Sequence, residues 1–439
     1  MGPVRDRLRP GATSLWRNRR FMKLWAGQTV SQLGTQITLL AMPLVAILLL
    51  HATPFEVGLL TAAEFAPFIL VGLPAGVWVD RLRRRPILIV SDVGRALTLA
   101  SVPVANAMHQ LTLPQLYIVV FVNGVLTVFF DVAYQSYLPS LVDRSQLVEG
   151  NGKLEISRSI AQLAGPGMAG VLVQTVGAAT AIVSDAVSYV VSVLFVSWIR
   201  GSEPPVERPA EPPRMRREIR EGLGYVFRHR LLRPIAACTG SANLADTMIF
   251  AILVLYAVRD LHLSPGLIGL VFAIGNIGAV VGALVAGAIG RRIGVGPTIV
   301  LSAVTFCLPA LLIPGAPVSM PLPFLAIGMT LISFGGVVYN VNQVGLRQAI
   351  TAPRMLGRMN ATMRFIVFGT MPIGAVLGGA LGSALGLRPT LWIAAGVGAL
   401  AFLPVALSPV RSLREIPEPG AEEGIAPAPV VPAPVPATE

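Results

Sequence analysis

The chain has 439 residues, of which 54% are hydrophobic and only 13% are charged, and its mean hydropathy is +0.70. This composition excludes a set of soluble domains and predicts an all-α integral membrane protein. A closed β-barrel needs short alternating strands, whereas the apolar runs here continue for about twenty residues, the length with which a helix crosses a bilayer. The net charge of +12 does not indicate nucleic acid, because the basic residues follow the loops. We expect anionic lipid headgroups as their partner.

A basic arm, residues 1–23, leads into an apolar run that is too long for a signal peptide, so we expect an uncleaved, cytoplasmic N-terminus. The length criterion predicts twelve transmembrane helices in two bundles of six, residues 24–200 and 235–411. The predicted spans are about 24–50, 55–79, 86–108, 113–138, 154–175, 178–199, 235–258, 264–289, 297–317, 321–346, 359–384 and 389–410.

Two polar segments flank the second bundle. The linker, residues 201–234, is rich in proline and glutamate and then in arginines with apolar residues every three or four positions. This pattern predicts an amphipathic helix at the cytoplasmic membrane surface, with a plain linker as the alternative. The Pro- and Ala-rich tail, residues 412–439, is too poor in large apolar side chains to fold and is expected to be a disordered cytoplasmic tail.

Positive charge sets the predicted topology, because short basic loops resist translocation across the membrane. All but three of the 34 Lys and Arg fall in segments that this topology places in the cytoplasm or in the adjoining helix turns. The exceptions are Arg95, inside a span, and Arg259 and Arg388, in outer loops. An odd number of spans in either half would invert the later basic loops.

The turn between the second and third spans has the pattern Gly-x-x-x-Asp-Arg-x-x-Arg-Arg. The glycine permits close helix approach and the aspartate can neutralise a helix N-terminus, although a generic basic loop is the alternative. The pattern resembles the loop between the second and third helices of the major facilitator superfamily of transporters. This resemblance implies that Gly76, Asp80, Arg81, Arg84 and Arg85 act in gating rather than in cargo binding.

Weak internal similarity predicts that the two bundles arose by duplication of a six-helix unit, the parallel repeat of this superfamily. A shift of 211 positions places Gly76 on Gly287, and a shift of 206 places Pro166 on Pro372.

Charges inside the bilayer are costly unless they face a cavity or a partner, so they are functional candidates. These residues are Glu64, Asp92, Arg95, Asp131, Asp185 and Asp246. Asp92 and Arg95 are three positions apart, and we expect them to form a structural ion pair with each other or with Asp131. Asp246 has no basic residue within a helical turn, and Glu64 has a similar setting. Reversible protonation of Asp246, Glu64 or Asp131 is therefore our hypothesis for proton coupling; a neutral carboxylic acid bonded to a neighbouring helix is the alternative.

The fifth span contains Gly165, Pro166 and Gly170, which free backbone groups and allow close helix contact. This segment resembles the Gly-Pro motif of drug/proton antiporters, although a kinked, tightly packed helix is the structural alternative. The chain also contains the fragments Ser31-Gln32-Leu33-Gly34, Tyr137-Leu138-Pro139-Ser140, Asp185-Ala186-Val187-Ser188-Tyr189 and Gly357-Arg358. Together these fragments resemble an exporter branch that includes bacterial macrolide, multidrug and enterobactin-type siderophore efflux proteins. Many of these proteins have an aspartate where Thr35 stands, and Asp246, its equivalent in the second half, could compensate.

These observations predict a transporter and not an enzyme. There is no Walker loop, no set of catalytic side chains and no Cys/His metal pattern, and Cys238 and Cys307 lie in apolar runs. We expect a monomer without cofactors, in a bacterial-type cytoplasmic membrane with both termini inside. Its predicted activity is proton-coupled efflux of a bulky, largely apolar small molecule by alternating access. The alternatives are an uptake permease of the same fold and a membrane receptor or scaffold that does not transport.

Overall fold

The computed structural model describes residues 15–79, 81–143, 146–199 and 215–415. Ten helices in this part of the chain are long and apolar enough to cross a membrane. The other two predicted spans are also helical: α2 is short and is followed by α3, and α6 is long but more polar. The predicted all-α membrane fold is therefore confirmed, and helices stand at all twelve predicted spans.

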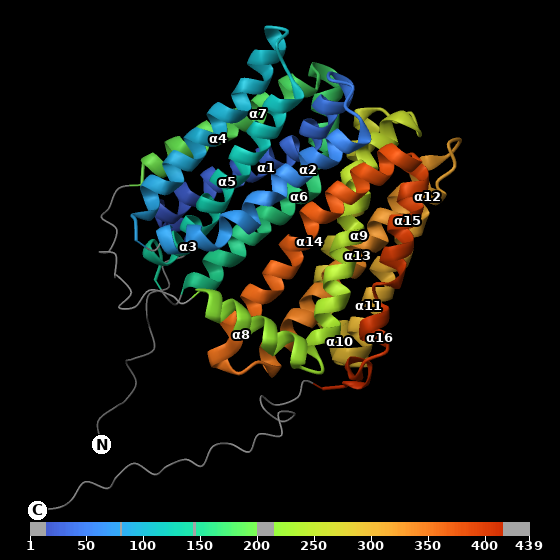
Figure 1. Cartoon of the computed structure of the whole chain (residues 1–439). Helices are drawn as coiled ribbons and strands as arrows, with labels where there is room; N and C mark the ends of the chain where they lie inside the picture. The colour runs from blue at the N-terminus through green and yellow to red at the C-terminus, as the bar shows by residue number, and fades with distance from the viewer. Residues whose placement is uncertain (1–14, 80, 144–145, 200–214, 416–439) are drawn as a thin grey trace, which may run out of the picture.

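The helices form an N-terminal and a C-terminal bundle that lie side by side (Figure 1). The N bundle contains α1 (Arg19–Leu48), α2 (Pro54–Leu70), α3 (Gly72–Val79), α4 (Arg84–Ala107), α5 (Leu113–Tyr137), α6 (Leu147–Val176) and α7 (Ala178–Ser197). After α8 (Met215–Arg228), the C bundle contains α9 (Leu232–Arg259), α10 (Pro265–Ile293), α11 (Val295–Cys307), α12 (Leu312–Gly315), α13 (Pro321–Ile350), α14 (Leu356–Leu385), α15 (Leu387–Leu400) and α16 (Leu403–Ala406).

Three of the predicted spans are interrupted. The second stops being regular at Val71, between α2 and α3. The ninth passes through a short 3-10 segment, Leu308–Leu311, and the twelfth pauses between α15 and α16. Prolines stand at two of these places, Pro309 and Pro404, where the missing N–H removes a helix hydrogen bond.

The two bundles repeat each other in backbone detail. His51 and His262, 211 positions apart, both have positive φ angles, 50° and 53°. Gly177 and Gly386, 209 positions apart, join the last two spans of each bundle with φ angles of 88° and 91°. The predicted duplication is supported, but the fifth and eleventh spans, α6 and α14, match at 209 positions rather than at the predicted 206.

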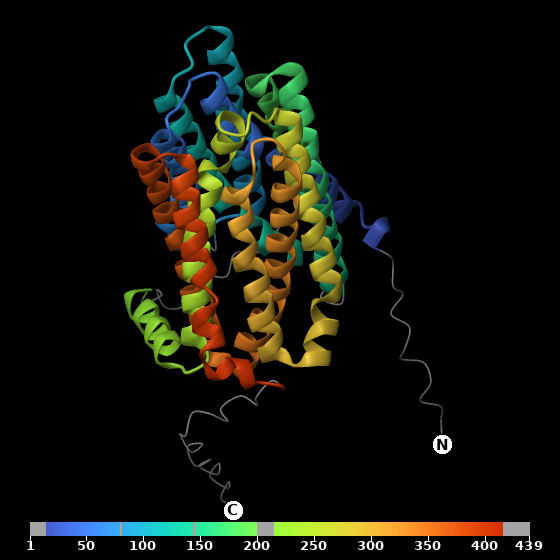
Figure 2. The ribbon, with the colours of Figure 1, turned by 90° about the vertical axis from the view of Figure 1, so that its right-hand side faces the viewer.

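We call the face with α8, the α3–α4 turn and the end of α16 the linker face, and the opposite face the far face (Figures 1 and 2). On the far side, one hydrophobic cluster contains buried residues of both bundles. Toward the linker face, each bundle has a cluster of its own. The bundles thus share a core only in the far half of the molecule.

Two helix crossings join the bundles in this far half. Gly58 of α2 meets Gly379 of α14, and Gly170 of α6 meets Gly269 of α10. At each crossing a side chain caps a helix start: the Phe55 amide donates to Ser383 Oγ at 2.9 Å, and the Gly266 amide donates to Gln174 Oε1 at 3.1 Å. The second crossing is the pseudo-symmetric copy of the first.

The outer-loop arginines predicted from sequence also have structural partners on this far face. Arg259 donates to the carbonyl oxygens of His51 and Ala52, at 3.3 and 2.8 Å, and so ties α9 to the loop after α1. Arg388 donates to the carbonyls of Pro314 and Ala316. Both guanidinium groups therefore donate hydrogen bonds that satisfy backbone carbonyl oxygens of the loops.

Candidate transport cavity

A cavity of about 1050 Å³ lies in the N bundle. Helices α1, α2, α4, α5, α6 and α7 contribute its lining. At its inner end it is lined by Met42 and Glu64, and it extends to Leu138 and Asn151 close to the linker face. Because the bundles share a core only on the far side, this cavity lies between that shared core and the linker face.

Most residues of the lining have polar side chains, although the larger part of the lining surface is apolar. The amides are Gln28, Gln32, Gln36, Asn123, Gln135, Asn151 and Gln162. The hydroxyl groups are those of Ser31, Thr35, Thr38, Thr127, Tyr134, Ser157 and Tyr189. Aromatic rings add apolar surface: Phe68 stacks on Phe368 of the C bundle with ring centroids 5.0 Å apart and an interplanar angle of 8°. The site can therefore offer many hydrogen bonds beside an aromatic wall.

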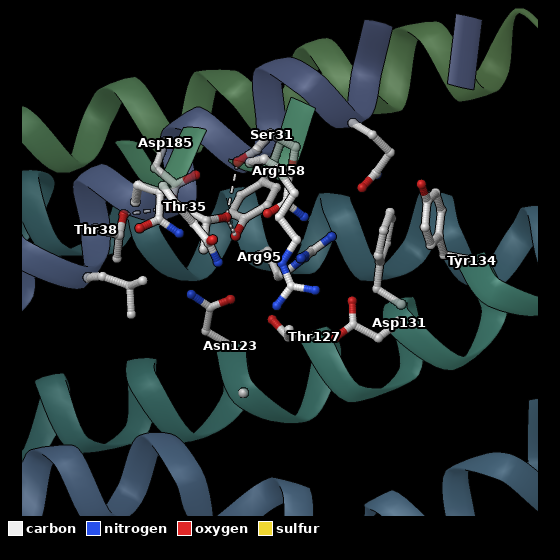
Figure 3. Close-up of a pocket in the computed structure, with 18 of the residues that line it drawn as sticks. Ser31, Thr35, Thr38, Arg95, Asn123, Thr127, Asp131, Tyr134, Arg158 and Asp185 are labelled. Carbon is white, nitrogen blue, oxygen red and sulfur yellow. Dashed lines mark hydrogen bonds between the residues drawn. The ribbon is translucent and has the colours of Figure 1, made fainter. Parts of the chain in front are cut away.

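Arg95 is the centre of a buried charge cluster. It pairs with Asp92 on the same helix, as predicted, and both side chains are almost fully buried. Its guanidinium lies between the rings of Phe130 and Tyr189, 4.2 Å from each centroid, a cation–π arrangement. Asp131 lies within Coulombic range of Arg95. Arg95 thus holds α4, α5 and α7 together beside the cavity (Figure 3).

A second cluster, around Asp185 of α7, contains hydroxyl groups rather than a bonded cation. Thr38 Oγ1 donates to Asp185 Oδ2 at 2.5 Å, and Ser188 Oγ donates to Asp185 Oδ1 at 3.0 Å. Gly34 allows α1 to come this close, because a Cβ at Gly34 would lie 2.5 Å from Asp185 Oδ1. One turn away, the hydroxyls of Thr35 and Tyr189 are 3.0 Å apart. In Figure 3, Asp185, Thr35 and Thr38 lie at one end of the site and Asp131 and Tyr134 at the other.

The three predicted proton-coupling residues are not brought together. Glu64 lines the cavity, and its carboxyl group has no hydrogen-bond partner in the described part of the chain. Asp131 also lines the cavity, within Coulombic range of Arg158 and of Arg364 from the C bundle. Asp246, in α9, does not belong to this lining. Its position thus separates it from the other two candidates.

The predicted gating hairpin lies at the linker-face end of the N bundle. Asp80 is outside the described residues, and Arg81 is exposed. Arg85 donates to the carbonyls of Val196 and Ser197, at 3.3 and 2.6 Å, and thereby ties α4 to the end of α7. Arg84 stands at the start of α4. The expectation that Gly76 permits close helix approach is wrong for this conformation, because among the described atoms none lies within 4 Å of a Cβ built there.

The Gly-Pro segment of α6 contacts both bundles. A Cβ on Gly165 would overlap the Gln36 side chain of α1, and a Cβ on Gly170 would lie 2.6 Å from the Pro265 carbonyl oxygen. The Pro166 carbonyl oxygen faces Gly269 of α10. Close packing, one of the two interpretations of this motif, is therefore present.

The predicted amphipathic linker helix exists as α8, which packs on α14 and α9 of the C bundle. Val226 is fully buried, and Glu221 pairs with Arg358 of α14 at 2.8 Å. Residues 201–214, the first part of the linker, lie outside the described residues, as do residue 200, residues 1–14 of the arm and 416–439 of the tail.

Sequence reasoning gave Asp185 no specific role, and it missed the two glycine crossings. A signal for the crossings was present: His51-Ala52-Thr53-Pro54 and His262-Leu263-Ser264-Pro265 match at a shift of 211 and are each followed by the crossing glycine four positions later. The sequence has no comparable signal for the contact between Asp185 and Thr38, which lie on different helices.

Two pseudo-symmetric helical bundles, with a polar cavity lined by the N bundle, define the major facilitator fold. Two solved structures agree in fold. A mutant of the nucleoside transporter NupG aligns with a TM-score of 0.71 and 15% sequence identity, covering 88% of this chain and 99% of NupG. A bacterial homologue of the iron transporter ferroportin, in an inward-facing state, aligns with a TM-score of 0.70 and 16% identity, covering 90% of this chain and 99% of the homologue. The chain belongs to the transmembrane secretion effector family, whose model matches residues 11–432, and so to a family of transporters rather than enzymes.

Its relatives include efflux proteins. The multidrug efflux pump Tap of Mycolicibacterium fortuitum is 26% identical over 372 residues, which cover 81% of this chain and 88% of Tap. Macrolide efflux protein A of Streptococcus pyogenes is 23% identical over 376 residues, covering 84% and 91%. The chain is therefore a multi-pass membrane transporter with distant homology to bacterial drug and macrolide efflux pumps.

Proposed function

We propose that this protein exports a bulky amphiphilic small molecule in exchange for protons, by alternating access of the two bundles. The observation that carries the proposal is the cavity, which extends toward the linker face beside Glu64, a carboxyl group with no bonded partner in the described part of the chain. The chain is related to efflux pumps along most of its length. A secondary transporter with bundles closed on one side and a site at mid-membrane fits this geometry.

The lining changes the cargo that we expect from a largely apolar molecule to one with hydrogen-bonding groups. A purely apolar cargo would leave the amides and hydroxyls of the cavity without partners, at a cost of about 1–3 kcal/mol for each group that loses water. The stacked rings of Phe68 and Phe368 suit an apolar or aromatic face of the same cargo. A macrolide, which the relative's name specifies, is the first cargo to test.

Coupling is proposed to use carboxyl groups that a conformational change can expose to either side. Glu64 and Asp131 line the cavity, and Asp246 stays our hypothesis for the C bundle. Protonation of such a group removes its desolvation cost and changes which conformation is favoured.

The test is transport of a labelled macrolide by the full chain in sealed vesicles with an imposed pH gradient. We expect uptake into vesicles whose linker face is outside and whose interior is acidic, and its loss when a protonophore collapses the gradient. Glu64→Gln should lower gradient-driven uptake on the order of tenfold, the usual size of coupling between two sites. Glu149→Gln is the matched control, because Glu149 pairs with Lys153 near the linker face, outside the cavity lining. Flux that ignores the gradient would contradict proton coupling.

The proposed orientation places the linker face in the cytoplasm, because the basic loops lie there. Cysteines introduced at His109 or Met320, exposed residues of far-face loops, should react in intact cells with an impermeant maleimide, whereas one at Ser412 should not. The native Cys238 and Cys307 are buried and leave little background. Labelling of Ser412→Cys alone would reverse the assignment.

A further inference from the structure

The Asp185 cluster has features that the mechanism above does not use. Asp185 is fully buried at the cavity wall, and the groups bonded to its carboxylate are hydroxyls rather than a cation. A carboxylate this deep must be compensated or protonated, since an unpaired charge in the bilayer is costly.

Hydroxyl partners are suited to both protonation states, because each can donate or accept. When Asp185 is ionised, Thr38 and Ser188 donate to its two oxygens. When it is protonated, its O–H can donate to one of these hydroxyl oxygens. Ser188 Oγ then keeps an acceptor for its own proton, the Asp185 carbonyl oxygen at 2.8 Å. The site therefore satisfies its polar groups with or without the proton.

The charged surroundings of Asp185 come from few elements. Helix α4 contributes Arg95 and its partner Asp92, and α7 itself contributes Tyr189. Between Lys23 and its C-terminal end, helix α1 has no Asp, Glu, His, Lys or Arg, and α6 has none between Arg158 and its C-terminal end. Arg95 lies within Coulombic range of both Asp185 and Asp131 (Figure 3), so the charge on one carboxyl affects the other.

We propose that Asp185 carries the driving proton of the N bundle and that Thr38 and Ser188 are its positioning residues. The inference rests on the proposed proton coupling. A proton from water on the far side binds one Asp185 oxygen as cargo leaves, and it passes to water of the cavity when new cargo binds from the linker face. Only the O–H bond forms and breaks, and Arg95 transmits the change to Asp131.

The first experiment does not depend on cargo. Infrared spectra of the full chain in vesicles, recorded across a pH titration, should show the carbonyl stretch of a protonated carboxyl group that disappears in Asp185→Asn. Asp143→Asn, a change at an exposed acid outside the cavity lining, should leave this signal unchanged. The double variant Thr38→Val with Ser188→Ala keeps the Asp185 carboxyl group but removes the hydroxyls bonded to it. It should therefore shift the pH at which the Asp185 carbonyl signal appears. A titrating carbonyl signal of the same size in Asp185→Asn as in the wild type overturns the proposal, whereas a smaller residual signal belongs to Glu64 or Asp131.

The second experiment uses the labelled macrolide. Asp185→Asn should lose gradient-driven uptake on the order of tenfold, while exchange of macrolide between equal concentrations on both sides continues. Gradient-driven uptake by Asp185→Asn at the wild-type level overturns the inference and leaves the proposed function standing. Wild-type protein without gradient-driven uptake overturns the proposed function, and the infrared titration then decides separately whether Asp185 binds a proton.

Discussion

Replacing a crossing glycine by alanine should stop export although the protein still folds. In Gly58→Ala the new Cβ would lie 2.5 Å from the Ala375 carbonyl oxygen, and in Gly379→Ala it would lie 2.8 Å from that of Pro54. Backbone atoms cannot turn aside as a flexible side chain can, so α2 and α14 must separate. We expect the far side to open and export to fall at least about tenfold, as expected when a conformational equilibrium shifts by more than about 1.4 kcal/mol.

The measurement is the distance between spin labels at His109 and Met320, on far-face loops of the two bundles, which should lengthen in Gly58→Ala and in its pseudo-symmetric partner Gly269→Ala. Gly369→Ala on α14 is the matched control, because no described atom lies within 4 Å of its added Cβ. Alanine favours helix over glycine by about 1 kcal/mol, so lost helicity cannot explain a defect. Unchanged distances with unchanged export would show that these crossings do not hold the far side closed.

Removal of the Arg95 side chain should cost more stability than any other single change in the cavity wall. Arg95→Met leaves Asp92, fully buried, without its cation, and breaking a buried ion pair from one side costs about 3–5 kcal/mol. The contacts with Phe130 and Tyr189 are lost as well. We expect a large drop in the unfolding temperature of the purified protein and low abundance in cells.

The double variant Asp92→Leu with Arg95→Met separates charge from packing. It removes both members of the pair, so it should recover most of the stability lost in Arg95→Met, since apolar replacement of a buried pair is often neutral or better. Thermal unfolding of the wild type, of the two single variants Arg95→Met and Asp92→Leu, and of the double variant in one detergent gives the interaction energy of the pair. Wild-type stability in Arg95→Met would mean that Asp92 is neutral without its partner.

The span positions were predictable because length and apolarity decide whether a segment crosses a bilayer. Each predicted range overlaps a helix, and the Asp92–Arg95 pair followed from a spacing of three positions on one helix. The prediction that Glu64 faces a polar pathway agrees with its place in the cavity lining. These features depend on local sequence.

The rest depends on which residues of different helices meet. Nothing in the sequence placed Thr38 beside Asp185, and the two are 147 positions apart. The sequence offset between the equivalent helices α6 and α14 was predicted as 206 positions, because Pro166 was aligned with Pro372. The crossing glycines Gly170 and Gly379, and the positive-φ glycines Gly177 and Gly386, show that the offset is 209 positions. Gly76 was given a packing role because its motif contains a glycine, yet in this conformation the added Cβ meets no described atom.

The paired crossings also bear on how the molecule arose. A half-length ancestor that associated with a second copy of itself would have formed this contact twice, because a two-fold axis makes both sides of an interface identical. Fusion of the copies removes that constraint, and each side can then change alone. The acceptors at the helix starts, a hydroxyl at Ser383 and an amide at Gln174, have already diverged, while the glycines opposite them have stayed.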